Sequence, residues 1–173
     1  MSNHLYGNQQ KGRSGSGNYG SQQRDNYSPP AFMEEIKKKK NLSDLTVDEI
    51  AKEDGIAELA AKEFQKDQRD QKGLNSTQLR KFFGQAKSIE ANLKENGWEA
   101  VSSDFAMLRP ILAYAKGRRT IPDSFYLFMT LCMGKIVSPN GDEKKTKENY
   151  KRFIQILESV VAYQKYHEKK KGE

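Results

Sequence analysis

The stretch that best indicates the fold is NSTQLRKFFGQAKSIEANLKENG, residues 75–97. It opens with Asn75, a residue type that caps helices, and Gln78 follows three positions later. Apolar side chains then recur at spacings of three and four, at Leu79, Phe82, Phe83, Ala86, Ile89 and Leu93. Because positions three and four apart share one face of a helix, this spacing predicts an amphipathic helix. Asn96 and Gly97 are typical of helix ends and are expected to stop it.

The same helical period continues on both sides of this stretch. Thr46 and Glu49 form a capping box that opens an earlier helix, which Gly55 can interrupt before the helix resumes. The next helix toward the C-terminus is expected to end at Gly117, and Pro110 inside it predicts a kink or a boundary. Helical segments are therefore expected throughout the chain from Thr46 onward.

Two further helices complete the pattern. Pro122 is expected at the first position of a fourth helix, since proline fits there without losing a hydrogen bond. A turn over residues 138–141 separates it from the last and longest helix. No stretch of useful length alternates as a strand does, so we predict an all-α fold, a single compact bundle of about five helices. The inward positions expected of the last three helices are Val101, Phe105, Leu108, Leu112, Ala115, Phe125, Phe128, Met129, Cys132, Ile136, Tyr150, Phe153, Ile154, Leu157, Val160 and Val161.

Residues 2–31 differ from the rest in composition, because Ser, Asn, Gly and Gln dominate them and two prolines stand near their end. Such a segment cannot bury enough apolar surface to offset the entropy lost on ordering. We therefore expect three regions in the chain. They are a disordered tail with a basic end over residues 1–43, the helical bundle over residues 44–168, and a frayed basic C-terminus over residues 169–173.

The formal net charge of +7 is distributed unevenly along the chain. Residues 41–70 carry four basic and nine acidic side chains, whereas residues 71–137 carry ten basic and five acidic ones. A basic segment beside an acidic one indicates a face that meets a polyanion. The alternative is charge that only keeps the protein soluble.

Residues that could support catalysis are scarce. The two histidines, His4 and His167, lie in the predicted tail and near the C-terminal end, away from the core. Cys132 lies inside an apolar run with no activating base nearby, as packed core cysteines do. The carboxylates of residues 44–70 alternate with lysines as on a solvated helix face. We therefore expect no enzyme activity, no metal site and no cofactor.

The cysteine count and the hydropathy pattern bear on location. A single cysteine cannot form an intrachain disulfide, which is typical of proteins in reducing compartments. The first residues contain no apolar core of signal-peptide length, and no stretch approaches the ~20 apolar residues of a membrane span. We expect a cytoplasmic protein that is neither exported nor embedded in a membrane.

Basic side chains follow the apolar stripes at fixed intervals. In each of two helices they recur seven positions apart, which places them along one side of the helix. This interval covers about 10.5 Å, enough to meet more than one phosphate of a nucleic acid. For Arg118 and Arg119, stabilisation of a helix C-terminus is an alternative role. The candidate RNA-contacting residues are Arg80, Lys81, Lys87, Lys94, Arg109, Lys116, Arg118 and Arg119.

Two other interpretations compete with RNA binding. Residues 46–56, TVDEIAKEDGI, resemble the first helix and turn of a helix-turn-helix DNA reader. The reading helix would cover residues 57–68, where Glu58, Glu63 and Asp67 outnumber two lysines, so DNA phosphates would repel it. The second alternative is a helical protein adaptor whose charges serve only solubility.

Three segments, in this order and at these separations, are similar to a known family. They are LNSTQLRKFFGQAKSIEANL (74–93), LRPILAYAKGRR (108–119) and NYKRFIQILESVVAYQKYHEKKK (149–171). The family they resemble is the small subunit of the type III-A CRISPR effector, the Csm complex. The resemblance covers roughly residues 74–168, and the long Ser/Asn/Gly tail departs from the family pattern.

The resemblance implies a small five-helix protein of the prokaryotic cytoplasm that contributes no catalytic residue. Family members stack in several copies along the inner side of a guide-RNA filament. The resemblance also implies a role in antiviral defence. The partners it implies are guide RNA and target RNA, contacted at phosphate and ribose, and the backbone and large subunits of the effector. The copy number, the RNA strand contacted, self-association of the free protein and the role of the tail stay open.

Overall fold

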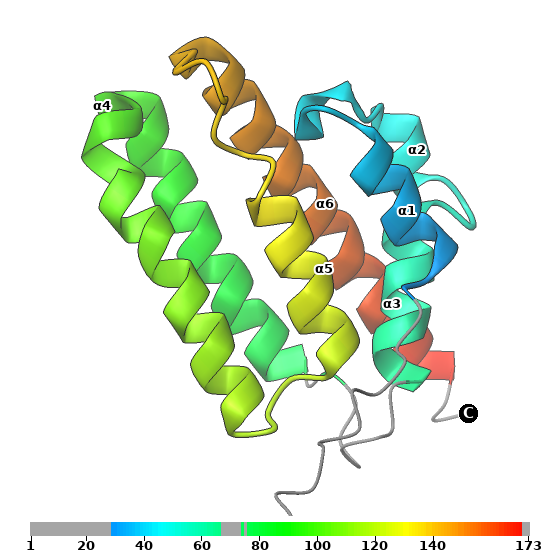
Figure 1. Ribbon diagram of the computed structural model, residues 1–173. Coiled ribbons are helices and arrows are strands. Elements are labelled where there is room, and N and C mark those ends of the chain that lie inside the picture. Colours follow the sequence, from blue (N-terminus) through cyan, green and yellow to red (C-terminus); the bar gives the residue numbers. More distant parts are fainter. Residues whose placement is uncertain (1–28, 67–73, 75, 171–173) are drawn as a thin grey trace, which may run out of the picture.

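The computed structural model describes residues 29–66, 74 and 76–170. Every regular element in this part of the chain is a helix, so the predicted all-α bundle is confirmed (Figure 1). No helix among the described residues has the length and apolar character needed to cross a bilayer. The elements are α1 (Ala31–Lys38), the short 3₁₀ helix η1 (Leu42–Asp44), α2 (Val47–Ala51), α3 (Ile56–Lys66), α4 (Ser76–Gly117), α5 (Asp123–Met133) and α6 (Glu143–Lys170).

α4 is a hairpin of two helical arms rather than one straight helix (Figure 1). Gly97, with φ 82° and ψ 177°, separates the first arm, residues 76–96, from the second arm, residues 98–117. Glycine adopts a positive φ readily, because it has no Cβ. A Cβ at this position would also lie 3.0 Å from Oε1 of Glu143. The helix end predicted at Gly97 is therefore confirmed.

Of the two outcomes predicted for Pro110, a kink or a boundary, the structure excludes the boundary, and Pro122 lies one helix position earlier than predicted. The second arm runs through Pro110 to Gly117, so Pro110 is not a helix boundary. Pro110 has no N–H for the carbonyl of Ala106, four residues earlier, but both residues are exposed and water can satisfy that carbonyl. Pro122 is the N-cap residue of α5 rather than its first helical residue.

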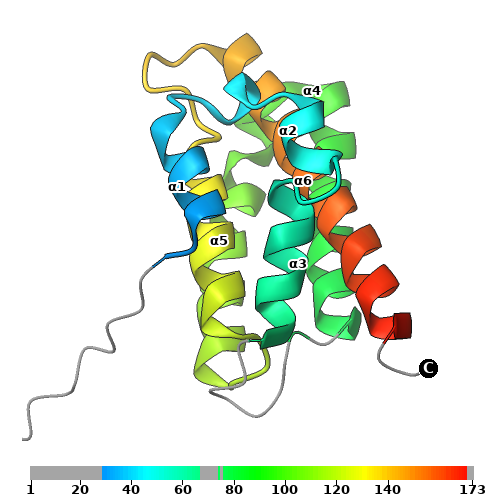
Figure 2. The same cartoon turned by 90° about the vertical axis from the view of Figure 1, so that its right-hand side faces the viewer.

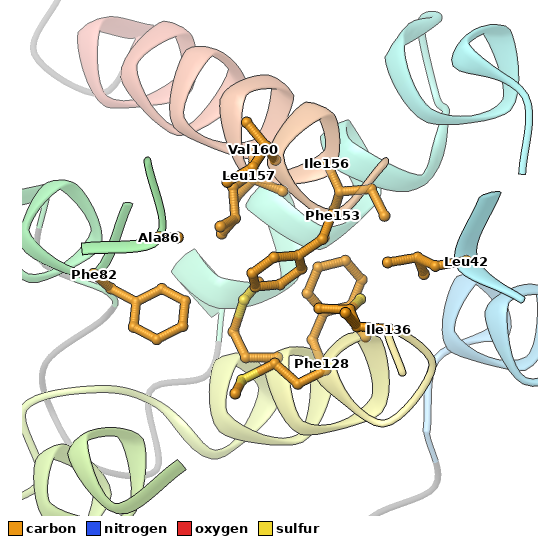
Figure 3. Close-up of a cluster of buried hydrophobic side chains, with 14 of the residues drawn as sticks. Leu42, Phe82, Ala86, Phe128, Ile136, Phe153, Ile156, Leu157 and Val160 are labelled. Atoms are coloured by element: carbon orange, nitrogen blue, oxygen red, sulfur yellow. The ribbon is translucent and has the colours of Figure 1, made fainter. Parts of the chain in front are cut away.

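α6 is the element around which the rest of the bundle packs. It lies against α4 on one side and α3 on the other, and α5 contacts both α3 and α4 (Figures 1 and 2). In the core, the apolar face of α6 meets Phe82 and Ala86 from α4 and Phe128 from α5 (Figure 3). The predicted inward residues of α6 are buried apart from Val161, which is half-buried.

The bundle begins earlier in the chain than predicted. α1 buries Phe32, Met33 and Ile36 in the core, and η1 buries Leu42. The ring of Phe32 packs edge-on against that of Phe128, with 5.8 Å between the ring centroids. These contacts join the N-terminal helix to α5.

The prediction of a disordered tail over residues 1–43 is therefore wrong for residues 31–43. Half of the side chains of α1 are charged, but Phe32, Met33 and Ile36 share one face and supply the burial that anchors a short helix. The predicted tail residues 1–28 lie outside the described residues. α6 continues to Lys170, past the predicted end of the bundle, and residues 171–173 also lie outside the described part.

α2 and α3 occupy the place of the suggested helix-turn-helix. The Thr46 hydroxyl accepts a hydrogen bond from the Glu49 N–H at 3.1 Å, and the Glu49 carboxylate accepts one from the Thr46 N–H at 2.6 Å. The predicted capping box is therefore confirmed. α3 packs against α1, α5 and α6, and Lys66 is its only exposed residue (Figure 2). The half-buried side chains of Leu59, Lys62, Glu63 and Gln65 leave this helix little surface for a DNA groove, which disfavours the helix-turn-helix interpretation.

Candidate nucleic-acid interface

All eight predicted RNA-contacting residues lie on α4 or in the turn that follows it. Because the chain reverses at Gly97, the start of the first arm and the end of the second arm lie at the same end of the bundle (Figure 1). We call this end, residues 76–81 and 114–119, the open end of the hairpin. The eight side chains fall into two groups, according to whether a carboxylate of the protein neutralises them.

Lys87 and Lys94 are held by Glu90 on the same arm. The Nζ atom of Lys87 lies 2.8 Å from Glu90 and 3.1 Å from Glu158 on α6. The Nζ atom of Lys94 lies 3.2 Å from Glu90. Burial opposes the ionisation of Glu90, but hydrogen bonds from both lysines outweigh it and lower its pKa. Much of the charge on these two lysines is therefore already matched inside the protein.

Lys116 is also matched within the protein. Its Nζ atom lies 2.6 Å from the carboxylate of Asp123, the first residue of α5, and 5.1 Å from the centroid of the Tyr126 ring. Through both contacts, Lys116 joins the end of α4 to the start of α5. Arg109 and Lys116 are seven residues apart, yet their roles differ. Arg109 is exposed, whereas Lys116 is bound to Asp123 of α5.

The other predicted cations are exposed, and none has a carboxylate partner among the described residues. We call them the unpaired cations. The guanidinium of Arg118 donates a hydrogen bond to the Tyr114 hydroxyl at 3.0 Å and lies 5.6 Å from the centroid of that ring. Lys81 and Arg118 line the same pocket at the open end, so the fold brings together two cations that are distant in sequence. The unpaired cations are Arg80, Lys81, Arg109, Arg118 and Arg119.

The turn after α4 holds Arg119 in an uncommon backbone conformation. Its φ is 55°, in the left-handed region that usually takes glycine at a helix end. The Thr120 N–H donates to the Ala115 carbonyl at 3.0 Å, and the Arg119 N–H donates to the Lys116 carbonyl at 2.8 Å. These two bonds define a Schellman motif. An arginine at the left-handed position of this motif carries a backbone cost that glycine would avoid.

Comparison with known proteins identifies the family of the chain. The family model Csm2 Type III-A matches residues 39–170. The chain belongs to the Csm2 type III-A family. It is therefore a small subunit of the type III-A CRISPR Csm complex and assembles with the other subunits of that complex. A search of curated proteins and a search of solved structures found no match.

This Csm2 family member has a second cluster of cations that the sequence analysis missed. Lys94 shares a depression of about 310 Å³ with Lys144, Lys147 and Lys151 of α6. Lys144 and Lys151 are exposed and have no carboxylate partner in the described part of the chain. The three α6 lysines are spaced at three and four residues, a signal that could have revealed the cluster. Two glutamates line the same depression, so its positive charge is partly neutralised.

The thiol of Cys132 is poorly placed to act as a nucleophile in this Csm2 family member. The thiol is fully buried, and burial raises its pKa to about 12, so it stays protonated at neutral pH. Among the described residues, no group of three or more His, Cys, Asp or Glu side chains could hold a metal ion.

Glu58 and His167 differ from the sequence-based expectation. Glu58 is buried, and its carboxylate accepts a hydrogen bond from the Asp54 N–H at 2.8 Å, so the prediction of solvated carboxylates is wrong for this residue. The Nε2 atom of His167 lies 3.1 Å from Oε1 of Glu58, outside hydrogen-bonding geometry. The spacing of residues could not reveal this contact, because α3 and α6 meet only in the folded chain.

Proposed function

We propose that this Csm2 family member binds RNA through the unpaired cations of the α4 hairpin. The observation that carries the proposal is that these exposed side chains have no carboxylate partner in the described residues, although ion pairs are common elsewhere on the surface. Cations without an internal partner favour an anionic ligand. An RNA-guided effector offers such a ligand in its guide and target RNAs.

Most of the unpaired cations contact phosphate and ribose rather than bases. A guanidinium presents donors in a planar fork that matches two phosphate oxygens, and four of the five unpaired cations are arginines. Long exposed side chains of this kind fix position on a backbone without selecting sequence. Base pairing between guide and target then supplies the choice of sequence.

The three paired lysines have a supporting role. Removing Lys87 or Lys94 would leave the buried carboxylate of Glu90 with one partner fewer, so both lysines first serve to neutralise it, and Lys87 also joins α4 to α6 through Glu158. Lys116 holds α4 against α5 in the same way. These three lysines contribute less to RNA binding than the unpaired cations do.

The subunit takes no part in the chemistry of RNA cleavage and needs no cofactor. The buried, protonated thiol of Cys132 supports this proposal, because a protonated thiol without access to solvent is a poor nucleophile. Its contribution to the effector is to position RNA beside the backbone and large subunits. Those partner subunits then carry the reaction.

The proposal is tested by the salt dependence of RNA binding. The full chain is titrated with labelled single-stranded RNAs of unrelated sequence at several salt concentrations. Each neutralised phosphate on a single strand contributes a slope of about −0.7 in log affinity against log salt, so losing four contacts should make the slope shallower by about 2 to 3 units. The test variant changes four unpaired cations to alanine, Arg80, Lys81, Arg109 and Arg119.

The matched control removes the same charge from the α1–α2 side of the bundle, across from α4 (Figure 1). Lysines at the start of α6 are unsuitable as controls, because Lys144 and Lys147 share a depression with Lys94. Equal loss of affinity in the two variants would mean that bulk charge alone drives binding. No loss in either would favour the protein adaptor. The control residues changed to alanine are Lys37, Lys38, Lys40 and Lys52, all exposed.

A further inference from the structure

A pocket of about 250 Å³ lies at the open end of the hairpin, between the two arms of α4 and the start of α5. Binding pockets for drug-sized ligands span roughly 300–1,000 Å³, so this one suits a smaller ligand of one ring system. Phe82, Leu112 and Phe125 give it an apolar floor, and each of these side chains is buried. A flat aromatic ligand would bury its faces against such a floor.

Two glutamines give this pocket hydrogen-bonding groups. Gln78 and Gln85 are seven residues apart on the first arm, so both face the second arm along one side of the helix. The side-chain oxygen of Gln85 is buried, and no described residue donates a hydrogen bond to it. Buried polar atoms without a partner are uncommon in proteins, and a donor from a ligand would satisfy this one. Carboxamides of this kind can pair with the edge of a nucleobase.

The rim of the pocket combines an aromatic ring with two cations. Tyr114 is 65% exposed, and the guanidinium of Arg118 lies against its ring. Lys81 stands on the opposite arm and lines the same pocket. An exposed tyrosine beside cations is the arrangement by which proteins stack a base and hold its phosphate.

We propose that this pocket receives one unstacked nucleobase of RNA. The base edge pairs with the glutamine carboxamides, the ring stacks on Tyr114, and the phosphate of the same nucleotide contacts Lys81 and Arg118. This inference rests on the proposed RNA-binding function and deepens it, because it adds one base contact to a set of backbone contacts. The carboxamides can pair with any base, so the pocket gives no strong sequence preference.

The test compares an oligouridine with an abasic ribose-phosphate strand of the same length, both titrated against the full chain. Tyr114→Ala removes the stacking platform and, because the side chain is exposed, opens no cavity. Stacking of one base on an aromatic ring contributes ~1–3 kcal/mol by alanine substitution, so affinity for oligouridine should fall by about fivefold or more. Affinity for the abasic strand should fall far less, since the variant releases Arg118 from Tyr114 but keeps all five unpaired cations. Met107→Ala, at a position 58% exposed on the same arm, is the matched control and should affect neither strand.

A second variant tests the carboxamide. Gln85→Leu keeps the side-chain size, and it also removes the unsatisfied oxygen, so folding should not suffer. It should weaken oligouridine binding and leave abasic binding unchanged. If Tyr114→Ala and Gln85→Leu bind both strands as the unchanged chain does, the pocket does not hold a base, although the cation proposal stands. If these variants bind RNA normally but fail to co-assemble with the partner subunits, the pocket is a protein contact and the inference is wrong.

The failure of the proposed function has a different signature. In that case the variant lacking Arg80, Lys81, Arg109 and Arg119 would bind the abasic strand as tightly as the unchanged chain. If the full chain binds neither strand even at low salt, both proposals fall together. Comparing the two strands across the pocket variants and the cation variant therefore separates the pocket from the cations.

Discussion

At the scale of single residues, the fold decides which cations are available to a ligand. The sequence places Arg80 and Lys87 on one line, and spacing alone makes them equivalent. In the folded chain Lys87 contacts Glu158, which is 71 positions away, whereas Arg80 has no carboxylate partner among the described residues. The candidate face could therefore be predicted from the sequence, but its division into paired and unpaired cations could not. That division depends on contacts between elements distant in the chain.

Arg119 gives a residue-scale prediction in which stability and binding change in opposite directions. Arg119→Gly should raise the free energy of unfolding by about 1 kcal/mol, because glycine adopts φ 55° without steric cost. The same change should weaken RNA binding, since one phosphate contact is lost. Urea unfolding and RNA titration measure the two effects.

Arg119→Ala is the control that separates charge from backbone. It loses the same charge as the glycine variant but keeps a Cβ in the left-handed conformation. It should weaken RNA binding equally without the gain in stability. Unchanged RNA affinity in both variants would remove Arg119 from the interface.

At the scale of elements, the sequence predicted long helices well and the shortest ones poorly. The hairpin of α4 followed from an apolar stripe of several turns and an Asn-Gly stop, both of which the structure confirms. α1 was missed because it has only two turns and lies between a Ser/Gly-rich stretch and a lysine run. Its stability comes from packing on α5 and α3 rather than from local propensity. Composition cannot report such tertiary stabilisation.

The role of α1 in the core gives an element-scale prediction. Ile36 is fully buried, so Ile36→Ala should lower the free energy of unfolding by about 2–5 kcal/mol. The neighbouring exposed side chain of Lys37 offers a control, and Lys37→Ala should cost less than about 0.5 kcal/mol. Thermal and urea unfolding of both variants measure the difference. A change below about 1 kcal/mol at Ile36 would mean that α1 does not pack as described.

At the scale of the whole molecule, charge and packing divide the bundle into two sides. α4 carries the unpaired cations, and the α1–α2 side lies across α5 and α6 from it (Figure 1). On that second side the lysines are largely paired, as Lys39 with Glu49 and Lys52 with Asp48. Two such unlike surfaces fit the proposal that one side contacts RNA and the other contacts proteins. The overall charge pattern was readable from the sequence, since residues 41–70 are acidic and residues 71–137 are basic.

We expect the open end of α4 to contact RNA inside the Csm complex and the α1–α2 side not to contact it. The most direct measurement places a photoreactive benzophenone amino acid at Arg80 in one variant and at Lys38 in another. Each variant is assembled with the partner subunits, guide RNA and target RNA, and is then irradiated. We predict an RNA crosslink from position 80 and little or none from position 38. Equal RNA crosslinking from both positions, or crosslinks from position 80 to protein alone, would contradict it.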